Sequence, residues 1–247
     1  MSRSLQNIFR NRSMIINKIK SKLKPYKWLH YMLSKKVIES DELWNSQLSF
    51  SQFGEDLILN SLFELRGIAN GFYVEVGAYN PLQLSNTYFY YKKGWRGICI
   101  EPNPKSINKM KLRRPGDIHL NLAVSMNPGK VQFVCDEAKS GILDESYIFK
   151  NQSGKECIMV ETQPLRSVFE QHLPQGQSIS FMSVDCEGHD LIVLESNNWE
   201  KYRPFVVLVE EHSEGKDQSI PNFLSAKQYE FYSRTGVTAF YIDKSAY

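Results

Sequence analysis

Several features of common protein classes are missing from this sequence. It contains no run of about 18 apolar residues, so it predicts no transmembrane helix. Its four cysteines, Cys99, Cys135, Cys157 and Cys186, form no CxxC pair, which favours reduced thiols in a cytosolic protein over disulfides or a zinc site. The basic N-terminus is interrupted by polar residues, so we expect no secretory signal peptide. A length of 247 residues suffices for one large α/β domain with an extension.

Acidic residues are absent before Glu39, where 10 of the 30 Lys and Arg residues lie. The remainder therefore holds 20 basic and 27 acidic side chains, a net charge of −7. Between Leu5 and Leu23 apolar residues recur at nearly helical spacing among basic ones, which predicts an amphipathic basic helix ending near Pro25. We expect a helical extension over residues 1–48 and one domain over residues 49–247.

The predicted N-terminal helix is compatible with three kinds of partner. It packs on its own domain or on a second copy of the chain, or residues 3–24 contact a membrane surface at its inner face. Each basic residue near an anionic leaflet contributes about 1 kcal/mol to such binding. Nucleic acid fits least well, because basic and aromatic residues do not interleave here and the body of the chain is negatively charged.

From residue 50 onward, strand patterns alternate with helix patterns. Apolar runs that read as buried strands, separated by helices, predict an α/β fold with an open, mostly parallel, doubly wound, Rossmann-like sheet. The segments "VQFV" (131–134) and "IMVET" (158–162) flank a polar stretch at 136–156, which we interpret as an insertion near the sheet edge or the pocket mouth. The predicted strands are 72–76, 97–101, 118–124, 179–184 and 205–210, and the predicted helices are 54–66, 83–93, 104–112, 165–172 and 189–196.

The segment "FYVEVGAYNP" (72–81) has the position of a nucleotide-binding corner but not its glycines. A dinucleotide site needs G-x-G-x-x-G, so that the backbone can approach the pyrophosphate. Here Gly77 stands alone, bulky residues follow it from Tyr79 to Pro81, and the carboxylate of Glu75 would repel phosphates. A cofactor with an ammonium group and a sulfonium group suits this corner, and S-adenosylmethionine carries both.

The ends of the next two predicted strands support the same cofactor. Glu101 ends "GICIE", 24 residues beyond Gly77, and its two oxygens can accept both ribose hydroxyls. Residues 121–123 end the third strand and could contact an adenine. Taken singly, a carboxylate at a strand end is more often solvated than functional.

Six segments together resemble the FkbM-type family of S-adenosylmethionine-dependent methyltransferases. They are "SQFGEDLIL" (51–59), "FYVEVGAYNP" (72–81), "SNTYFYYKKGWRGICIEPNP" (85–104), "NLAVS" (121–125), "SVDCEGHDLIVLES" (183–196) and "PFVVLVEEH" (204–212). The resemblance covers about residues 50–212. It implies a class I methyltransferase fold and O-methyl transfer, with substrates that include natural products and sugars of surface polysaccharides.

The resemblance also implies that the segment at 51–56 folds back over the cofactor. Gln52 and Asp56 are then candidates for the methionine end, although Ser51, Glu55 and Asp56 would equally serve as a helix N-terminus. The full set of residues that we expect to bind the cofactor is Gln52, Asp56, Glu75, Gly77, Ala78, Asn80, Ser85, Glu101, Pro102, Asn121, Ala123 and Asp185.

Two further segments carry candidate catalytic residues, "VDCEGHD" and "VEEH". Asp185, Glu210 and His212 could together hold a divalent cation such as Mg²⁺ or Mn²⁺, which would lower the pKa of an acceptor hydroxyl. Alternatively His212 or His189 acts as a general base without a metal. On the simplest interpretation Asp185 is a cofactor contact, and Glu210 and His212 are polar residues leaving a buried strand.

These expectations combine into a functional hypothesis. The chain is expected to be a cytoplasmic, S-adenosylmethionine-dependent O-methyltransferase acting on a hydroxyl of a sugar, a nucleotide sugar or a glycan intermediate. A nicotinamide-dependent oxidoreductase is disfavoured by the missing glycines, and a nucleic-acid methyltransferase by the negative body. A non-catalytic, membrane-associated interaction protein with a residual cofactor site is the remaining alternative.

Overall fold

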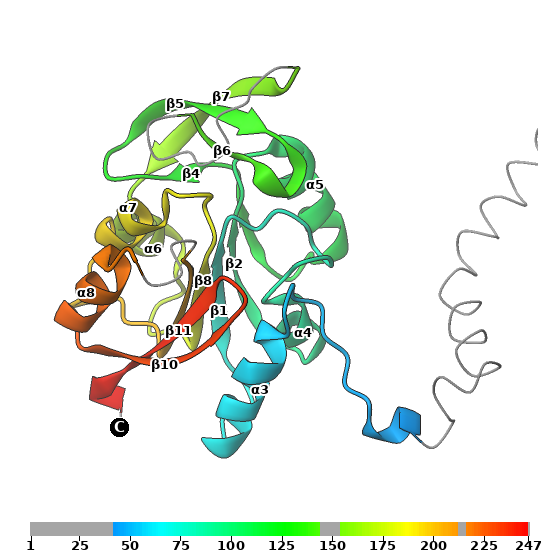
Figure 1. Cartoon of the computed structure of the whole chain (residues 1–247). Coiled ribbons are helices and arrows are strands. Elements are labelled where there is room, and N and C mark those ends of the chain that lie inside the picture. Colours follow the sequence, from blue (N-terminus) through cyan, green and yellow to red (C-terminus); the bar gives the residue numbers. More distant parts are fainter. Residues whose placement is uncertain (1–41, 144–153, 212–215, 247) are drawn as a thin grey trace, which may run out of the picture. The chain divides into compact units, whose positions relative to one another are not determined.

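The computed structural model describes residues 42–143, 154–211 and 216–246 (Figure 1). The chain divides into two units, Met1–Leu48 and Ser49–Tyr247. In the first unit a short 3-10 helix, η1 (Glu42–Asn45), is described, and the basic helix predicted before Pro25 lies outside the described residues. The second unit contains both β-sheets of the described residues.

A seven-stranded sheet forms the centre of this unit, in the order β10-β11-β9-β8-β1-β2-β3. Strands β3, β2, β1, β8 and β9 are parallel neighbours, whereas β11 is antiparallel to both β9 and β10. The predicted open, mostly parallel, doubly wound sheet is confirmed. The strands are β1 Phe72–Val76, β2 Arg96–Ile100, β3 Ile118–Leu120, β8 Phe181–Val184, β9 Val206–Glu210, β10 Tyr229–Thr235 and β11 Thr238–Asp243.

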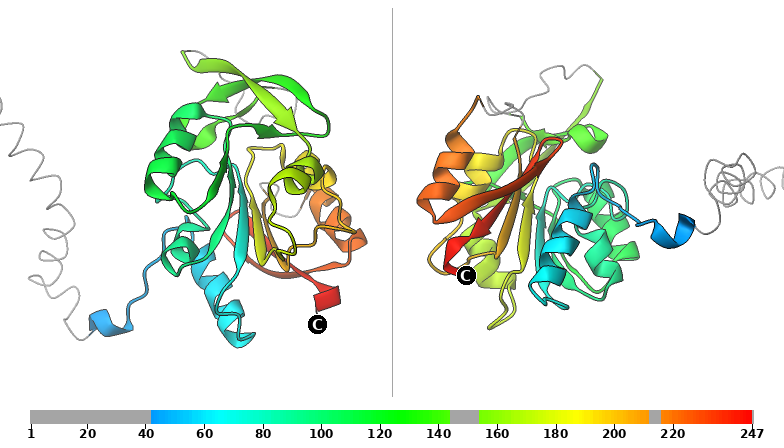
Figure 2. Two further views of the ribbon diagram at one scale, coloured as in Figure 1. Left: turned by 180° about the vertical axis from the view of Figure 1, so that it is seen from behind. Right: turned by 60° about the horizontal axis from the view of Figure 1, so that its bottom comes forward.

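Helices cover both faces of the sheet (Figures 1 and 2). Alternate residues of each strand point to opposite faces, so Val74 and Val76 join one apolar core and Tyr73 joins the other. Helices α6 (Leu165–His172), α7 (Asp190–Glu195) and α8 (Ser219–Ala226) pack into the first core. Helices α3 (Glu55–Leu65), α4 (Tyr88–Lys92) and α5 (Pro104–Arg113) pack into the second. Burial on both faces explains why the strands read as apolar runs.

A second, four-stranded sheet lies at one end of the large sheet (Figure 1). Its order is β4-β7-β5-β6, with β4 Ala123–Val124, β5 Gly129–Cys135, β6 Gly141–Ile142 and β7 Glu156–Gln163. A short 3-10 helix, η2 (Glu137–Lys139), connects β5 to β6. A small apolar core of its own, made by Ala123, Phe133, Ile142 and Val160, holds this sheet together. The described residues of the predicted insertion, 136–143 and 154–156, therefore belong to a separate small sheet and its connections.

Two predicted elements are shorter than expected. The strand predicted over 118–124 divides into β3 in the large sheet and β4 in the small one, because the chain turns at Asn121. The amide nitrogen of Asn121 donates to the carbonyl oxygens of Glu101 (2.9 Å) and Pro102 (2.7 Å). The helix predicted over 83–93 begins only at Tyr88, because Asn80 Oδ1 accepts the N–H groups of residues 82 and 83 and so forms a turn.

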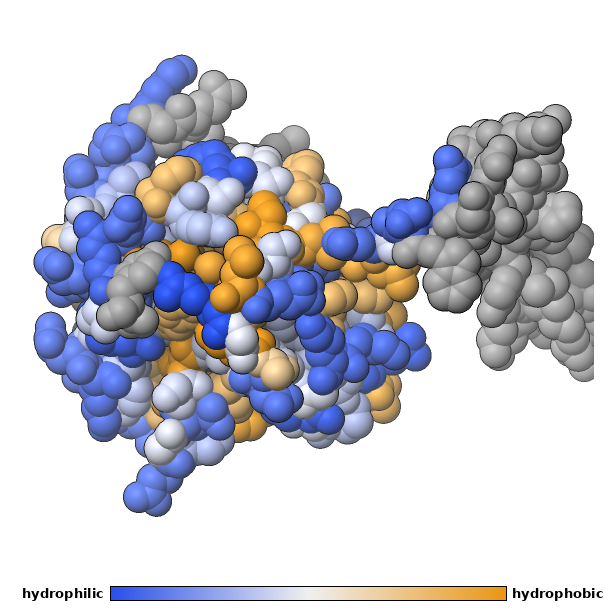
Figure 3. Space-filling model, turned by 90° about the horizontal axis from the view of Figure 1, so that it is seen from below, coloured by the Kyte–Doolittle hydropathy of each residue, from blue (hydrophilic) through white to orange (hydrophobic). Residues whose placement is uncertain are grey.

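The strand order reverses beside β1, whose neighbours are β2 on one side and β8 on the other. In open α/β sheets, ligands bind outside the carboxyl ends of the strands at such a reversal. No helix among the described residues is both long enough and apolar enough to cross a bilayer. On the face shown in Figure 3, hydrophobic residues lie mainly toward the middle, and hydrophilic residues surround them.

Candidate active site

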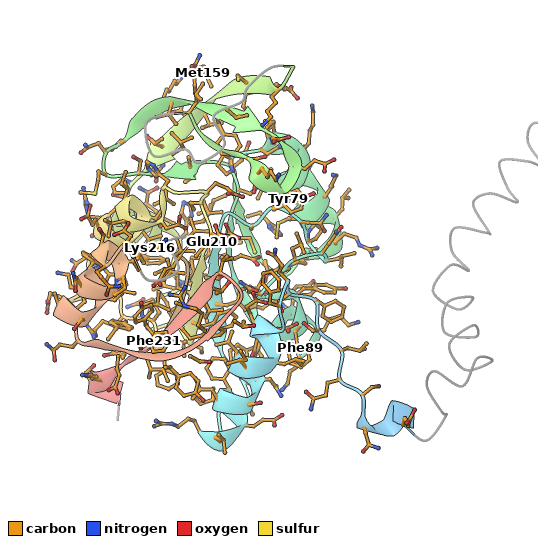
Figure 4. The ribbon with its side chains drawn as sticks, viewed as in Figure 1. Tyr79, Phe89, Met159, Glu210, Lys216 and Phe231 are labelled. Atoms are coloured by element: carbon orange, nitrogen blue, oxygen red, sulfur yellow. The ribbon has the colours of Figure 1, made fainter. Side chains whose placement is uncertain are left out.

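A cavity of about 290 Å³ lies at the carboxyl ends of β1, β2, β8 and β9, and the small sheet forms one of its walls. This size is near the lower end of small-molecule sites, which are roughly 300–1,000 Å³. Residues Gly77, Glu101, Asp185 and Glu210 line it from the strand ends, and Phe133 and Ile142 from the small sheet. Figure 4 shows Glu210 and Tyr79, another lining residue, below the small sheet.

Gly77 lets the chain after β1 pass close to the end of β8. Its φ angle is +84°, and an added Cβ would lie 1.9 Å from the carbonyl oxygen of Asp185. The N–H groups of Gly77 and Ala78 both donate to the carbonyl of Ile100. The single glycine of the corner is therefore required by the crossing of two backbones, and no phosphate loop is needed to explain it.

Glu101 lines the pocket directly after β2 and is 4% exposed. Its Oε1 accepts the N–H of Asn103 at 2.6 Å, which fixes the side chain and leaves the carboxylate able to accept further hydrogen bonds. Burial raises the pKa of Glu101 to about 7, against the lowering effect of the Asn103 hydrogen bond. A ligand that donates hydroxyl groups would favour the ionised form.

Asp185 and Glu210 end the neighbouring strands β8 and β9, and their carboxyl groups are hydrogen-bonded to each other. Asp185 is exposed, and it lines the pocket. Partial removal of water by the surrounding protein raises the pKa of Asp185 above its usual range, and the charges of Glu210 and Asp190 raise it further. Burial, followed by repulsion from Asp190 and Glu187, raises the pKa of Glu210 to about 8. Both shifts favour the protonated forms, so the pair binds a proton more readily than two separate carboxyl groups do.

The loop after β8 brings two more polar residues to the pocket, Glu187 and His189, and both are buried. Glu187 has a left-handed φ of +55°, and the carboxylate of Asp190 holds the loop by accepting the N–H groups of Cys186 (2.9 Å) and Gly188 (3.1 Å). Burial raises the pKa of Glu187 to about 8, and Asp185 and Asp190 contribute to the rise, whereas Lys139 lowers it.

Glu101, Asp185, Glu187 and Glu210 are called the pocket carboxylates below. All four line the same cavity, and Lys139 is the one lysine or arginine among the described lining residues. The raised pKa values of these four groups indicate that nearby cations do not offset the cost of placing their negative charges in the pocket. Such a pocket favours a positively charged ligand and disfavours one with phosphates near the strand ends.

Glu75 lies elsewhere, in a buried group called the Arg114 cluster. Arg114, 0% exposed, contacts Glu75 (3.2 Å) and Asp117 (2.8 Å) and also donates to Tyr73 Oη (3.0 Å) and Thr87 Oγ1 (2.8 Å). Glu75 additionally accepts hydrogen bonds from Ser85 and Thr87. Glu75 does not line the pocket, and its charge is compensated by Arg114.

Half of the residues expected to bind the cofactor line the pocket, namely Gln52, Gly77, Glu101, Pro102, Ala123 and Asp185. Asp56 instead accepts hydrogen bonds from Ser49 Oγ, Phe50 N and Ser51 Oγ and so holds the segment before α3. Asn80 forms a turn, Ser85 binds Glu75, Ala78 is buried, and the Asn121 amide binds backbone carbonyls. Their cofactor roles remain predictions.

The predicted catalytic residues Asp185, His189 and Glu210 lie together in the pocket, and His212 is outside the described residues. Within the described parts of the chain, no group of three or more His, Cys, Asp or Glu side chains is arranged to hold a metal ion. The proposed metal site of Asp185, Glu210 and His212 thus has no support from the described residues.

Sequence reasoning missed several residues of the site. Phe53 and Val237 line the pocket, and η2 adds Glu137 and Lys139 to its wall. The polar stretch at 136–156 is a signal for this wall, because it predicts an insertion near the sheet edge or the pocket mouth. No sequence pattern indicated Val237, because it lies beyond the last recognised motif.

A family model described as "Methyltransferase FkbM domain" matches residues 75–231, more than half of the chain. Solved structures with a similar arrangement include a TehB-like SAM-dependent methyltransferase from Corynebacterium glutamicum, with 9% identity, a TM-score of 0.38, and coverage of 91% of this chain and 100% of that one. An O-methyltransferase from Bacillus cereus in complex with SAH has 11% identity, a TM-score of 0.44, and coverage of 86% and 96%. A Thermoplasma acidophilum protein has 8% identity, a TM-score of 0.36, and coverage of 77% and 89%. No curated protein matches the chain.

Proposed function

Because the chain belongs to the FkbM-type family of S-adenosylmethionine-dependent methyltransferases, we propose that it methylates a hydroxyl group of a sugar, a nucleotide sugar or a glycan intermediate. The observation that carries the proposal is the set of pocket carboxylates at the carboxyl ends of β2, β8 and β9. We propose further that the reaction takes place in the cytoplasm, within the assembly of a surface polysaccharide or natural product. The basic residues at 3–24 are then available for contact with the inner face of the membrane.

The residues of the pocket fit S-adenosylmethionine. Glu101 offers a buried carboxylate to the ribose hydroxyls, and the apolar residues Leu122 and Ala123 offer a surface to the adenine. Gly77 and Gln52 line the region assigned to the methionine end. The excess of carboxylates favours the positive charges of the ammonium and sulfonium groups. When bound, the cofactor supplies an electrophilic methyl group on a positively charged sulfur.

The Asp185–Glu210 pair is the proposed general base. A sugar hydroxyl is a weak acid, so it must lose its proton near the transition state. The ionised member of the pair accepts this proton, and the hydrogen bond between the two carboxyls keeps that member oriented. Because the pKa of Glu210 is raised to about 8, its ionised form is a stronger base than an ordinary carboxylate. His189, which lines the same pocket, is the second candidate for this role.

The test is an incubation of the full chain with labelled S-adenosylmethionine and a panel of UDP- and GDP-hexoses, with and without a chelator. We expect label to appear in at least one sugar. Unchanged transfer in the presence of chelator would assign the base to the protein alone, and loss of transfer would assign part of the activation to a divalent cation. Absence of transfer to every hexose would contradict the proposed substrate class.

A further inference from the structure

Phe53 is an exposed aromatic side chain at the pocket. It follows Gln52 in the segment before α3, lines the cavity, and keeps 48% of its surface exposed. Aromatic residues at pockets commonly supply a ligand-binding surface. The cofactor residues assigned above do not include Phe53.

The backbone around Phe53 is fixed from several sides. The segment at 49–51 is held by Asp56, and the carbonyl of Phe50 accepts the N–H of Ser85 at 3.1 Å. The carbonyl of Phe53 accepts the hydroxyl of Thr235 at 2.9 Å, and its N–H donates to Glu55 Oε2 at 2.7 Å. None of these bonds involves the aromatic ring, so replacing the ring leaves the backbone anchored.

The turn between β10 and β11 supports the ring itself. Gly236 has a φ of +53°, and a Cβ added there would lie 2.3 Å from Phe53 Cδ2 and 2.6 Å from Cε2. The ring therefore packs directly on the backbone of Gly236, and no other residue type leaves room for it in this position. A glycine at this turn is required by the position of Phe53 as well as by the backbone angle.

This supported ring lies on the side of the pocket where the proposed base is found. Val237, which follows Gly236 and also lines the pocket, accepts the N–H of Glu211 at 2.8 Å, and Thr238 is paired with Glu210 in the sheet. An exposed aromatic surface close to two carboxylates combines two complementary features. The ring offers a face for weakly polar C–H groups, and the carboxylates accept hydroxyl protons. A pyranose ring presents both kinds of group.

We propose that Phe53, supported by Gly236, is the surface on which the sugar ring of the acceptor packs, so that Phe53 positions the acceptor hydroxyl over the Asp185–Glu210 pair. This inference rests on the proposed function and names the part of the acceptor that is recognised. It makes the turn at Gly236 a determinant of acceptor binding although that turn contains no catalytic group.

Saturation-transfer difference NMR on the full chain, with methyl α-D-glucopyranoside and methyl β-D-galactopyranoside as probes, tests the proposal. Wild-type protein should transfer saturation to the ring C–H protons of at least one probe, and Phe53→Ala should weaken its binding about tenfold. Gly236→Ala should have a similar effect, because the added methyl group displaces the ring. In the double variant Phe53→Ala/Gly236→Ala the two losses should not add, because the ring that Gly236 supports is already gone.

Two matched controls separate this role from general damage. Phe231→Ala removes an aromatic residue that is 53% exposed on β10, away from Glu210 in Figure 4, and should leave probe binding unchanged. Gly176 has a φ of +74° and no atom within 4 Å of an added Cβ, so Gly176→Ala carries the same backbone strain without the steric clash. It should also bind the probe as wild type does.

Two results would overturn the proposal: no saturation transfer to either sugar in wild-type protein, or undiminished transfer in Phe53→Ala. Failure of the proposed function gives a different result: no label would pass from S-adenosylmethionine to any hexose of the panel, whereas undiminished saturation transfer in Phe53→Ala beside normal label transfer would remove only the role of Phe53. If Phe53 contacts only the acceptor, Phe53→Ala should retain the wild-type affinity for S-adenosylhomocysteine.

Discussion

The Arg114 cluster and the pocket carboxylates lie in the same domain, and both contain buried acidic side chains. In the cluster, the charges of Glu75 and Asp117 face the guanidinium of Arg114, which the protein itself supplies. In the pocket, Glu101 and Glu210 have pKa values raised to about 7 and about 8 because no equivalent cation lies beside them. The difference indicates that the Arg114 cluster stabilises the fold. The negative charges of the pocket carboxylates are instead neutralised by bound protons or by a cationic ligand.

The largest effect is expected on stability, when the cation of the Arg114 cluster is removed. Arg114→Met leaves the carboxylates of Glu75 and Asp117 buried without their cation, so it should lower the free energy of unfolding by about 3–5 kcal/mol. Urea denaturation followed by circular dichroism measures this change. Arg113→Met, at the exposed neighbouring residue, should change stability by less than about 0.5 kcal/mol. Equal effects of the two substitutions would show that Arg114 does not stabilise the fold in this way.

Substitution of a pocket carboxylate should lower turnover instead of stability. Asp185→Asn removes one member of the proposed base pair, so kcat for methyl transfer should fall about 10²–10⁴-fold. The affinity for S-adenosylhomocysteine, measured by calorimetry, should change far less. Cys186→Ala alters the next residue in the same pocket and should keep most of the turnover. Wild-type turnover in Asp185→Asn would remove Asp185 from the mechanism.

Substitution of Glu101 should weaken cofactor binding, with a smaller free-energy change than the two substitutions above. Glu101→Ala should weaken S-adenosylhomocysteine binding by about 1–3 kcal/mol through the loss of charged hydrogen bonds. Since ribose hydroxyls favour the ionised carboxylate, wild-type affinity should also decline as the pH falls below about 7, the pKa of Glu101. Glu161→Ala, at an exposed carboxylate on β7, is the control. Unchanged affinity in Glu101→Ala would refute the ribose assignment.

The smallest effect concerns how stability depends on pH. Glu210 is protonated in the folded state up to about pH 8 but ionises near its ordinary value of 4.5 when unfolded, so it lowers stability as pH rises between these values. Thermal unfolding of Glu210→Gln should show a shallower decline over this range, by on the order of 1 kcal/mol. Glu195→Gln, at an exposed glutamate on α7, should behave as wild type. If the stability of Glu210→Gln declines as steeply with pH as that of wild type, the raised pKa of Glu210 is contradicted.

The parts of the molecule that could be predicted are those encoded by local sequence. Apolar runs predict β1, β2, β8 and β9, and the carboxylates that end those strands must meet at one edge of a parallel sheet. Glu101, Asp185 and Glu210 were identified in this way, and all three line the pocket. The prediction for Glu75 relied on the same local pattern and did not anticipate the guanidinium that faces it.

The remaining features depend on contacts between distant residues. The sequence "KLRRP" does not reveal that Arg114 is buried while Arg113 is exposed. The carbonyl of Phe53 meets the hydroxyl of Thr235, which is 182 residues away, and no motif covers the final 30 or so residues. The support of Phe53 by Gly236 could therefore be recognised only once the fold had placed β10 and β11 beside the segment before α3.

A crystal structure of the chain with S-adenosylhomocysteine would test the central contrast between the two groups of carboxylates most directly. The account predicts that the ribose lies against Glu101 and that the sulfur lies in the pocket beside Asp185, while Glu75 remains bound to Arg114. A ligand that contacts Glu75, or one that lies away from both Glu101 and Asp185, would contradict it.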